Sequence, residues 1–306
     1  MSHMDDRMAH AFTVDVEDWY HGGPDDMPLM DGMSRLANGL DRLLDLLQEH
    51  KAKATFFWLG VAARDNPALL RKVVAQGHEL GCHGHRHRHV HRMSPAAFQA
   101  DITQATDTLA QIAGVRPSGY RAPYFSLSLD TLWAFSILQE AGMAYDSSVF
   151  PHRQGPRAIQ PLHGGPQWVK TASGRIAELP MSSCPWGLAS IPACGGAYFR
   201  AYPYALTRRN LRWLEARGHF ANFYIHPWEL DPGHPRLPST WRQALIHNHG
   251  MGSVNDKLRR LMRDFRFTTL GDQLDRLLAD GNALPRLTLR GDPMDPATRN
   301  IPQPQR

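Results

Sequence analysis

Apolar and polar positions along the chain follow two alternating patterns. Short apolar runs rich in β-forming residues predict buried strands, and they lie at 11–16, 54–60, 78–83, 119–125 and 143–150. Segments with apolar residues at helical spacing predict helices, at 34–50, about 66–76, 94–114 and 128–141. Ser34 is a candidate cap for the first of these helices, and Gly114 is a candidate stop for the third.

This alternation of strands and helices predicts an α/β fold, with a parallel sheet and helices outside it. At least six units within 306 residues favour a barrel over an open sheet. The stretch at about 151–200 is rich in Pro, Gly and Ser, which predicts an elaborated loop region. We expect one domain over 11–283, with a tag remnant or disordered segment at 1–10 and a proline-rich tail at 284–306.

The composition is that of an ordinary globular protein, with 42% apolar and 21% charged residues. Lys and Arg number 34 against 29 acidic residues, a net charge of +5, but the basic residues are scattered. A surface of mixed charge is therefore expected, and a nucleic-acid partner is not. The sequence leaves the oligomeric state open.

The cysteines and the apolar runs indicate a compartment. Three cysteines without a CxxC pair, Cys82, Cys184 and Cys194, argue against a disulfide framework and for reducing conditions. No apolar stretch has the length of a signal peptide or a membrane span. We expect no transmembrane segment and a cytoplasmic location, including the inner face of the membrane.

Polar side chains recur where the predicted strands end, namely Asp15, His83, Arg121, Asp146 and His226. In parallel α/β folds the carboxyl ends of the strands meet at one edge, and that edge carries the active site. These side chains are therefore candidates for one common site.

Residues 82–91, CHGHRHRHVH, contain five histidines. On one extended strand all five would share a face, and burying them would be unfavourable without hydrogen-bond partners. If the chain turns after His83, then His83 and His87 can converge on one metal ion. Exposed or core histidines are the alternative. The other histidines near the motifs are predicted not to bind the ion, namely His21, His85, His89, His91 and His152, and Cys82 is predicted to be buried packing.

Three carboxylates crowd into the segment VDVEDWY at 14–20, namely Asp15, Glu17 and Asp18. Like charges at this spacing are unfavourable unless a positive group compensates them. A solvated turn is the simple explanation. A divalent cation held by one acid, with a second acid beside it as a base, explains the acidic and the histidine clusters together.

The motifs VDVEDW, HGHRH, YRAPYF, YDSS and YIHPWEL occur in the order of the five motifs of the NodB-homology polysaccharide deacetylases, carbohydrate esterase family four. The chain resembles this family over roughly 11–270. The segments DVEDWYH, RAPYFS, FYIHPWELDP and CGGAYFRAYP resemble more narrowly the deacetylases encoded in exosortase-linked exopolysaccharide gene clusters.

The resemblance implies a distorted (β/α) barrel and a divalent metal, most often zinc, with cobalt or nickel as alternatives. In the family an Asp and two His hold the metal, and the histidines match His83 and His87. The first family motif has two adjacent Asp residues, of which the first is the general base and the second a ligand. Asp15 matches the base, but DVED replaces DD, so Glu17 or Asp18 must supply the ligand. Strand alternation favours Glu17, and a turn beginning at Glu17 favours Asp18.

The resemblance also implies the catalytic roles. Asp15 would take a proton from water that the metal activates, and the metal with the backbone N–H of Tyr124 would stabilise the oxyanion. His226 would protonate the departing amine. Arg121 matches the arginine that orients the base, and Asp146 the acid that supports this network. The alternatives are that Arg121 only forms a structural ion pair and that Asp146 only caps a turn.

The expected activity is metal-dependent hydrolysis of an N-acetyl amide on an amino sugar of a bacterial exopolysaccharide or of its lipid- or nucleotide-linked precursor. Aromatic residues near the motifs are candidates for stacking on sugar rings, although such residues are commonly core, and these are Trp19, Trp186, Tyr198 and Trp228. Two alternatives remain: a deformylase or ureide or small-amide hydrolase on the same fold, and a non-catalytic sugar-binding protein.

Overall fold

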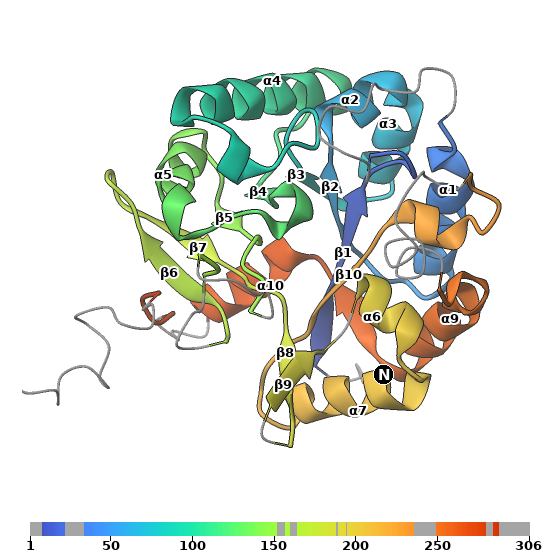
Figure 1. The fold of residues 1–306 in the computed structure, drawn as a ribbon. Helices are drawn as coiled ribbons and strands as arrows, with labels where there is room; N and C mark the ends of the chain where they lie inside the picture. Colours follow the sequence, from blue (N-terminus) through green and yellow to red (C-terminus); the bar gives the residue numbers. More distant parts are fainter. Residues whose placement is uncertain are drawn as a thin grey trace, which may run out of the picture.

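A curled sheet of mostly parallel strands forms the centre of the protein (Figure 1). The computed structural model describes residues 8–21, 34–151, 157–159, 164–187, 189–193, 195–235, 249–279 and 284–287. Within them the strand order is β10-β1-β2-β3-β4-β5-β7-β6, and β11 also pairs with β1. The strands are β1 (Ala9–Val16), β2 (Thr55–Trp58), β3 (Glu79–Cys82), β4 (Gly119–Tyr120), β5 (Tyr145–Asp146), β6 (Gln167–Lys170), β7 (Arg175–Glu178), β10 (Asn222–Ile225) and β11 (Arg266–Thr268).

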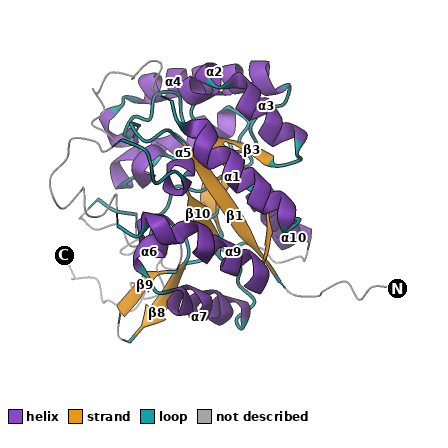
Figure 2. Ribbon diagram, turned by 90° about the vertical axis from the view of Figure 1, so that its right-hand side faces the viewer, coloured by secondary structure: helices purple, strands orange, loops and turns teal. Residues whose placement is uncertain are grey.

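Helices surround this sheet. Figure 2 shows β1 running between them, with α2, α3 and α4 at one end of the molecule and α7 at the other. The helices are α1 (Leu36–Glu49), α2 (Gly60–Asp65), α3 (Pro67–Ala75), α4 (Pro95–Ala113), α5 (Trp133–Glu140), α6 (Gly196–Ala201), α7 (Tyr204–Glu215), α9 (Val254–Asp264) and α10 (Leu270–Ala279). The predicted barrel is therefore confirmed as a curled half-barrel. None of the described helices combines the length and the apolar character that crossing a bilayer requires.

The first strand lies in the interior of the sheet. Every residue of β1 is buried, which is the pattern of a parallel strand covered on both faces. It pairs with β2 on one side and with β10 and β11 on the other, and Val14 lies opposite both Phe56 and Ile225. This apolar stretch fixes the position of the acidic residues at its carboxyl end.

The segment at 151–200 is more ordered than its composition predicts. Its described part contains the antiparallel pair β6–β7, which joins the main sheet, and a separate hairpin formed by β8 (Ser183–Trp186) and β9 (Ala189–Pro192). Pro, Gly and Ser marked the turns, but the four-residue strands between them are too short to show a clear alternation. Residues 284–287, assigned above to the tail, lie along β6: Trp168 N donates to Pro285 O at 2.7 Å, and Leu287 N donates to Trp168 O at 2.7 Å.

Helix α1 begins at Leu36, and its amino end receives a carboxylate from a distant segment. Arg35, not Ser34, occupies the cap position, and the Ser34 hydroxyl accepts a hydrogen bond from Leu36 N at 3.4 Å. The stronger acceptor is Asp18, whose Oδ2 lies 3.0 Å from Arg35 N. A carboxylate at this place satisfies amides that the helix leaves unpaired and complements its dipole.

Candidate metal and catalytic site

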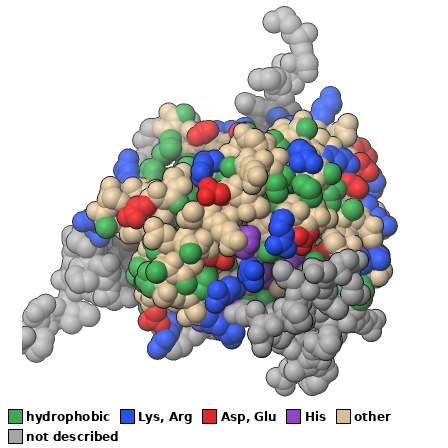
Figure 3. Space-filling view, turned by 90° about the horizontal axis from the view of Figure 1, so that it is seen from above, with side chains coloured by type: hydrophobic (Ala, Val, Ile, Leu, Met, Phe, Trp, Pro, Cys, Tyr) green, Lys and Arg blue, Asp and Glu red, His purple; other side chains and the backbone are tan. Residues whose placement is uncertain are grey.

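Three side chains that are far apart in sequence meet beyond the carboxyl ends of β1 and β3. Glu17, His83 and His87 are buried, and each offers one ligand atom within 4.8 Å of the others. Figure 3 views the molecule from the side toward which β1 points and shows histidine side chains near the centre of that face. Among the described residues this is the only such group of His, Cys, Asp and Glu.

The two histidines are held in one tautomer by backbone carbonyls. Nδ1 of His83 lies 2.8 Å from Arg121 O, and Nδ1 of His87 lies 2.8 Å from His21 O. Because a carbonyl oxygen only accepts, each Nδ1 carries a proton, and the neutral form of each ring therefore has its lone pair on Nε2. Burial, with the neighbouring His87, lowers the pKa of His83 to about 4, so this imidazole is neutral at pH 7. Metal-binding histidines have this arrangement.

Glu17 is ionised and points one oxygen at His87. Burial raises the pKa of Glu17, but His87 and His226, when they carry a proton on the nitrogen that faces it, lower this pKa well below its usual range. Its Oε2 lies 2.6 Å from Nε2 of His87, so these two atoms need a proton or a cation between them. A carboxylate oxygen facing the imidazole lone pairs fits a divalent cation of the zinc type, for which two His and one carboxylate are a common ligand set.

The structure separates the two acids that the sequence left open as ligands. Glu17 N donates to Asp15 O at 3.1 Å, so the chain turns at Val16 and brings Glu17 into the cluster. Asp18 lies outside the cluster. Besides Arg35 N, its carboxylate accepts a hydrogen bond from Trp19 N at 2.9 Å, and it serves the start of α1.

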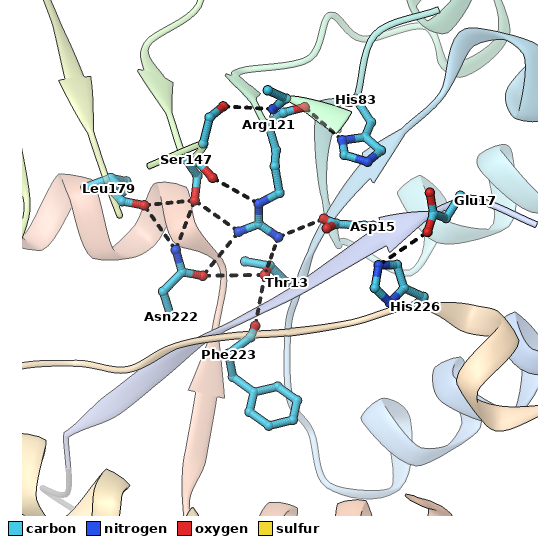
Figure 4. Close-up of polar contacts among 12 residues, drawn as sticks. Thr13, Asp15, Glu17, His83, Arg121, Ser147, Leu179, Asn222, Phe223 and His226 are labelled. Atoms are coloured by element: carbon cyan, nitrogen blue, oxygen red, sulfur yellow. Dashed lines mark hydrogen bonds and ion pairs between the residues drawn. The ribbon is translucent and has the colours of Figure 1, made fainter. Parts of the chain in front are cut away.

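Asp15 lies two residues before Glu17 and is held by a buried arginine (Figure 4). Arg121 Nη1 donates to Asp15 Oδ1 at 2.7 Å and to Thr13 Oγ1 at 2.8 Å. Its other nitrogens donate to Ser147 O at 3.1 Å, Ser147 Oγ at 3.0 Å and Asn222 Oδ1 at 3.3 Å. The guanidinium is fully buried, and this bonding fixes the orientation of Asp15.

His226 follows β10 and faces Glu17 from the opposite side of the cluster. Its Nε2 lies 3.3 Å from Glu17 Oε1, and its Nδ1 lies 2.8 Å from Oε1 of Glu229. Burial lowers the pKa of His226, but the carboxylates of Glu17 and Glu229 outweigh this effect and raise the pKa to about 9. The imidazole is therefore charged at pH 7 in the metal-free protein, and its Nε2–H can serve as a proton donor.

Glu229 and Arg200 complete the site but were not among the residues selected from the sequence. Glu229 forms a buried ion pair with Arg200, and it also accepts a hydrogen bond from His226 N at 3.0 Å. The one available signal was the three-residue interval in HPWE, which brings Glu229 back over His226 in a 3-10 turn (Pro227–Leu230). Such an interval is common in turns and carries little information by itself.

Asp146 does not contact His226 in the described part of the chain. It is fully buried, and its carboxylate accepts hydrogen bonds from Ser148 N at 2.9 Å and Ser148 Oγ at 2.6 Å. Its link to Arg121 runs through the neighbouring serines rather than through a direct hydrogen bond. The carboxylate that contacts the imidazole of His226 in its place is Glu229.

The aromatic candidates are placed differently from one another. Trp228 is buried and stacks on His226 with 5.1 Å between ring centroids, and its Nε1 donates to Glu17 Oε1 at 3.4 Å. Trp19 is buried in one hydrophobic cluster with Trp228. Trp186 is 53% exposed on the β8–β9 hairpin, at the end of the molecule where α7 lies and away from this site (Figure 1).

Tyr124 lies beside the histidines and has a left-handed backbone, with φ of 56°. Its hydroxyl donates to His21 O at 3.0 Å, and its ring stacks on His89 with 4.0 Å between centroids. Tyr198 packs against Phe150, with 6.1 Å between the two ring centroids.

Of the remaining predictions, Cys82 is buried and free, as Cys184 is. His21, His85 and His91 are not part of the three-residue cluster, and neither is His89. His152 and Cys194 lie outside the described residues.

Comparison with known proteins divides the chain into two matched regions. Residues 25–145 match the family model for polysaccharide deacetylases, and residues 147–275 match a domain of unknown function, DUF3473. Over 103 residues the chain is 31% identical to a peptidoglycan-N-acetylglucosamine deacetylase of Bacillus cereus, covering 32% of this chain and 38% of that protein. Over 103 residues it is 33% identical to a chitooligosaccharide deacetylase of a Bradyrhizobium strain, covering 33% and 46%.

A solved structure shares the fold of this chain. A Mycobacterium smegmatis protein, provisionally assigned as a polysaccharide deacetylase, superposes with a TM-score of 0.63 at 19% identity, over 95% of this chain and 96% of that one. The alignments span less than half of either named relative, whose names are those of hydrolases acting on amide C–N bonds. The predicted resemblance to polysaccharide deacetylases is therefore confirmed for a domain at residues 25–145, which is part of the 11–270 over which the motifs extend.

Proposed function

We propose that the protein is a metal-dependent hydrolase that removes the N-acetyl group from an amino sugar. The observation that carries this proposal is the meeting of Glu17, His83 and His87, with both Nδ1 atoms bonded to carbonyls and both Nε2 lone pairs available. The polysaccharide deacetylase domain and the named activities of the relatives support it. Glu17, rather than Asp18, is the proposed carboxylate ligand.

The bound cation, which we propose to be zinc with cobalt or nickel as alternatives, would activate water and polarise the acyl carbonyl. Asp15 is the proposed base. It lies two positions before the proposed ligand Glu17 in the sequence, and Arg121 keeps its carboxylate oriented. We keep the backbone N–H of Tyr124 as the proposed oxyanion donor. Tyr124 has a left-handed φ, and its ring lies 4.3 Å from that of His87 between centroids, which puts this residue beside the proposed metal ligands.

His226 is the proposed acid for the departing amine. An amine leaves an amide readily only if its nitrogen gains a proton. The imidazole is partly exposed, at 17%, so a substrate can reach it, and Glu229 holds its Nδ1–H so that Nε2 faces the cluster. Asp15 and His226 would thus act from two sides of the same acyl group.

The exopolysaccharide substrate is also a proposal, supported by the narrower motif resemblance. A panel of N-acetylglucosamine oligomers, nucleotide-linked and lipid-linked N-acetyl sugars, N-formyl sugars and ureides would identify the substrate by release of acetate or formate. Release from formyl sugars or ureides alone would favour a different amide hydrolase on the same fold. The absence of release from any of them, with metal bound, would favour a sugar-binding protein.

Two neighbouring acids provide a matched test of the metal site. Glu17→Gln removes the proposed ligand charge, so we expect it to lose bound zinc in elemental analysis and to lose deacetylation. Asp18→Asn should retain the metal and most of the activity, with a loss of about 1 kcal/mol of folding stability from the weaker helix cap. If Asp18→Asn loses the metal and Glu17→Gln keeps it, the ligand assignment is wrong.

A further inference from the structure

Two further buried acids, Asp146 and Glu178, lie near the site, and neither is a proposed metal ligand. Asp146 on β5 and Glu178 on β7 are opposite each other in the parallel pairing of these strands, and both are fully buried. Side chains at paired positions of neighbouring strands project to the same face of the sheet. The fold therefore places two carboxyl groups side by side in the interior.

The hydrogen bonds around the pair leave one oxygen unexplained. Both oxygens of Asp146 accept hydrogen bonds from Ser148, and Glu178 Oε1 accepts one from Val149 N at 3.0 Å. Glu178 Oε2 is buried and has no hydrogen-bond partner among the described residues if the group is a carboxylate. A protonated Oε2 would instead be a donor, and Asp146 is the acceptor beside it.

Electrostatics favours one proton for the two groups. Two ionised carboxylates at one buried place repel each other and are poorly solvated, whereas one shared proton replaces the repulsion with a hydrogen bond. Burial raises the pKa of Glu178 well above its usual range, and the Asp146 carboxylate raises it further. Burial also raises the pKa of Asp146, but hydrogen bonds from Glu178 and Ser148 oppose that rise. The proton therefore belongs on Glu178.

Residues 147–149, which bind this pair of acids, also bind Arg121. Ser148 Oγ donates to Asp146 and accepts a hydrogen bond from Ala122 N at 2.8 Å. Ser147 offers its carbonyl and its hydroxyl to the Arg121 guanidinium, which in turn binds Asp15. A change in the pair would reach Asp15 through Ser147 and Arg121.

We propose that Glu178 is protonated at neutral pH, donates a hydrogen bond to the Asp146 carboxylate, and acts through residues 147–149 as a positioning residue for Arg121 and Asp15. Only the final step, the effect on Asp15, rests on the proposed function. The protonation state and its effect on stability do not.

Isosteric variants of the two acids give opposite predictions. Glu178→Gln keeps a neutral group with a donor for Asp146 and an acceptor for Val149 N, so it should keep kcat/KM within about threefold of wild type. Asp146→Asn places an NH2 group against donors of Ser148, so kcat/KM should fall about a hundredfold through displacement of Arg121. If Asp146→Asn is tolerated and Glu178→Gln is not, or if both variants keep full activity, the proposal is overturned.

A measurement without substrate tests the proton directly. The infrared difference spectrum of Glu178→Gln against wild type should show the loss of one protonated-carboxyl C=O band at pH 7. If no such band is lost, Glu178 is ionised and the proposal fails, whatever the enzyme's activity. Glu178→Gln that fails to fold at pH 7 would overturn it as well, because glutamine matches the protonated form in shape and hydrogen bonding.

Thermal stability supplies the pH readout. Within the described part of the chain, the charged groups facing Glu178 are Asp146 on β5 and Arg121 beyond β4. A carboxyl group whose folded pKa is raised stabilises the fold at low pH, and this stability is lost as pH rises above its unfolded value of about 4.5. The difference in Tm between Glu178→Gln and wild type should therefore increase as the pH rises from 5 through neutral pH. A Tm difference that does not change with pH would contradict the proposal.

Discussion

At the scale of single residues, the reactivity of His226 depends on Glu229. The carboxylate that binds the His226 imidazole comes from three residues downstream of the histidine itself. Arg200 balances the charge of Glu229, so that the pair fixes the imidazole without leaving a buried carboxylate unpaired. This chain thus holds its proposed acid by a local turn rather than by a long-range contact.

Replacement of Glu229 should therefore change both the rate and its pH dependence. We expect Glu229→Gln to lower kcat by about 10- to 100-fold, a part of what general acid catalysis contributes. Removal of a carboxylate that raises the pKa of His226 also makes the imidazolium less stable. The alkaline limb of the kcat profile should shift toward neutral pH, because His226 then loses its proton at lower pH.

A surface acid in an ordinary ion pair is the control for this experiment. Asp107, which pairs with Arg116 at 2.9 Å, is exposed and distant in sequence from the site motifs. Asp107→Asn should leave the kcat profile unchanged. An unshifted alkaline limb in Glu229→Gln would show that Glu229 does not set the protonation of His226.

At the scale of secondary structure, the packing of α1 against the turn after His226 depends on one glycine. A Cβ built on Gly39 would lie 1.8 Å from Pro227 O, which is backbone and cannot rotate away. The absence of a side chain lets the helix approach the residue directly after His226. Helix propensity disfavours glycine at this place, so the close approach explains its presence.

We expect Gly39→Ala to lower the free energy of unfolding by about 1–3 kcal/mol or more, as overpacked substitutions do. It should also lower kcat, because Pro227 and His226 must move together. Gly252→Ala is the control, since no atom lies within 4 Å of the Cβ position there. Chemical denaturation of both variants tests the expectation, and equal stabilities would contradict it.

Elements with strong local signals were predictable from the sequence. Helix α4 was expected over 94–114 and is found at Pro95–Ala113, with Ser94 Oγ accepting from Ala97 N at 3.2 Å and Gly114 at φ of 74°. The β8–β9 hairpin was not predicted, because its four-residue strands include Pro185 and Pro192. The site residues differ in the same way. Glu229 reaches His226 through a local three-residue interval that is too common to be a signal, whereas Arg200 and Glu178 depend on tertiary contacts that no local pattern encodes.

At the scale of the molecule, the two matched regions share one sheet. The boundary between them, at 145–147, falls at β5, which pairs with β4 on one side and with β7 on the other. Strand β10, from the domain of unknown function, pairs with β1. His226, Glu229 and Arg200 all lie in this second region, so the site combines residues from both sides of the boundary.

A fragment ending at residue 146 should therefore fail to fold cooperatively. It would lack the strands that cover both edges of β1–β5 and would expose Phe12, which stacks on Phe223 with 5.1 Å between centroids. We expect an insoluble or molten product, measured by near-ultraviolet circular dichroism and by dye binding against the full chain. A soluble fragment with a sharp thermal transition would contradict this expectation.

Helix α1 touches the neighbours of two proposed functional groups at once. Its amino end holds Asp18, next to Glu17, and its Gly39 lies against Pro227, next to His226. Loosening of this single helix on heating would disturb the cation pocket and the proton donor in the same step. Release of the proposed metal and loss of the proposed activity should then share one midpoint temperature, and that midpoint should lie below the one for melting of the sheet.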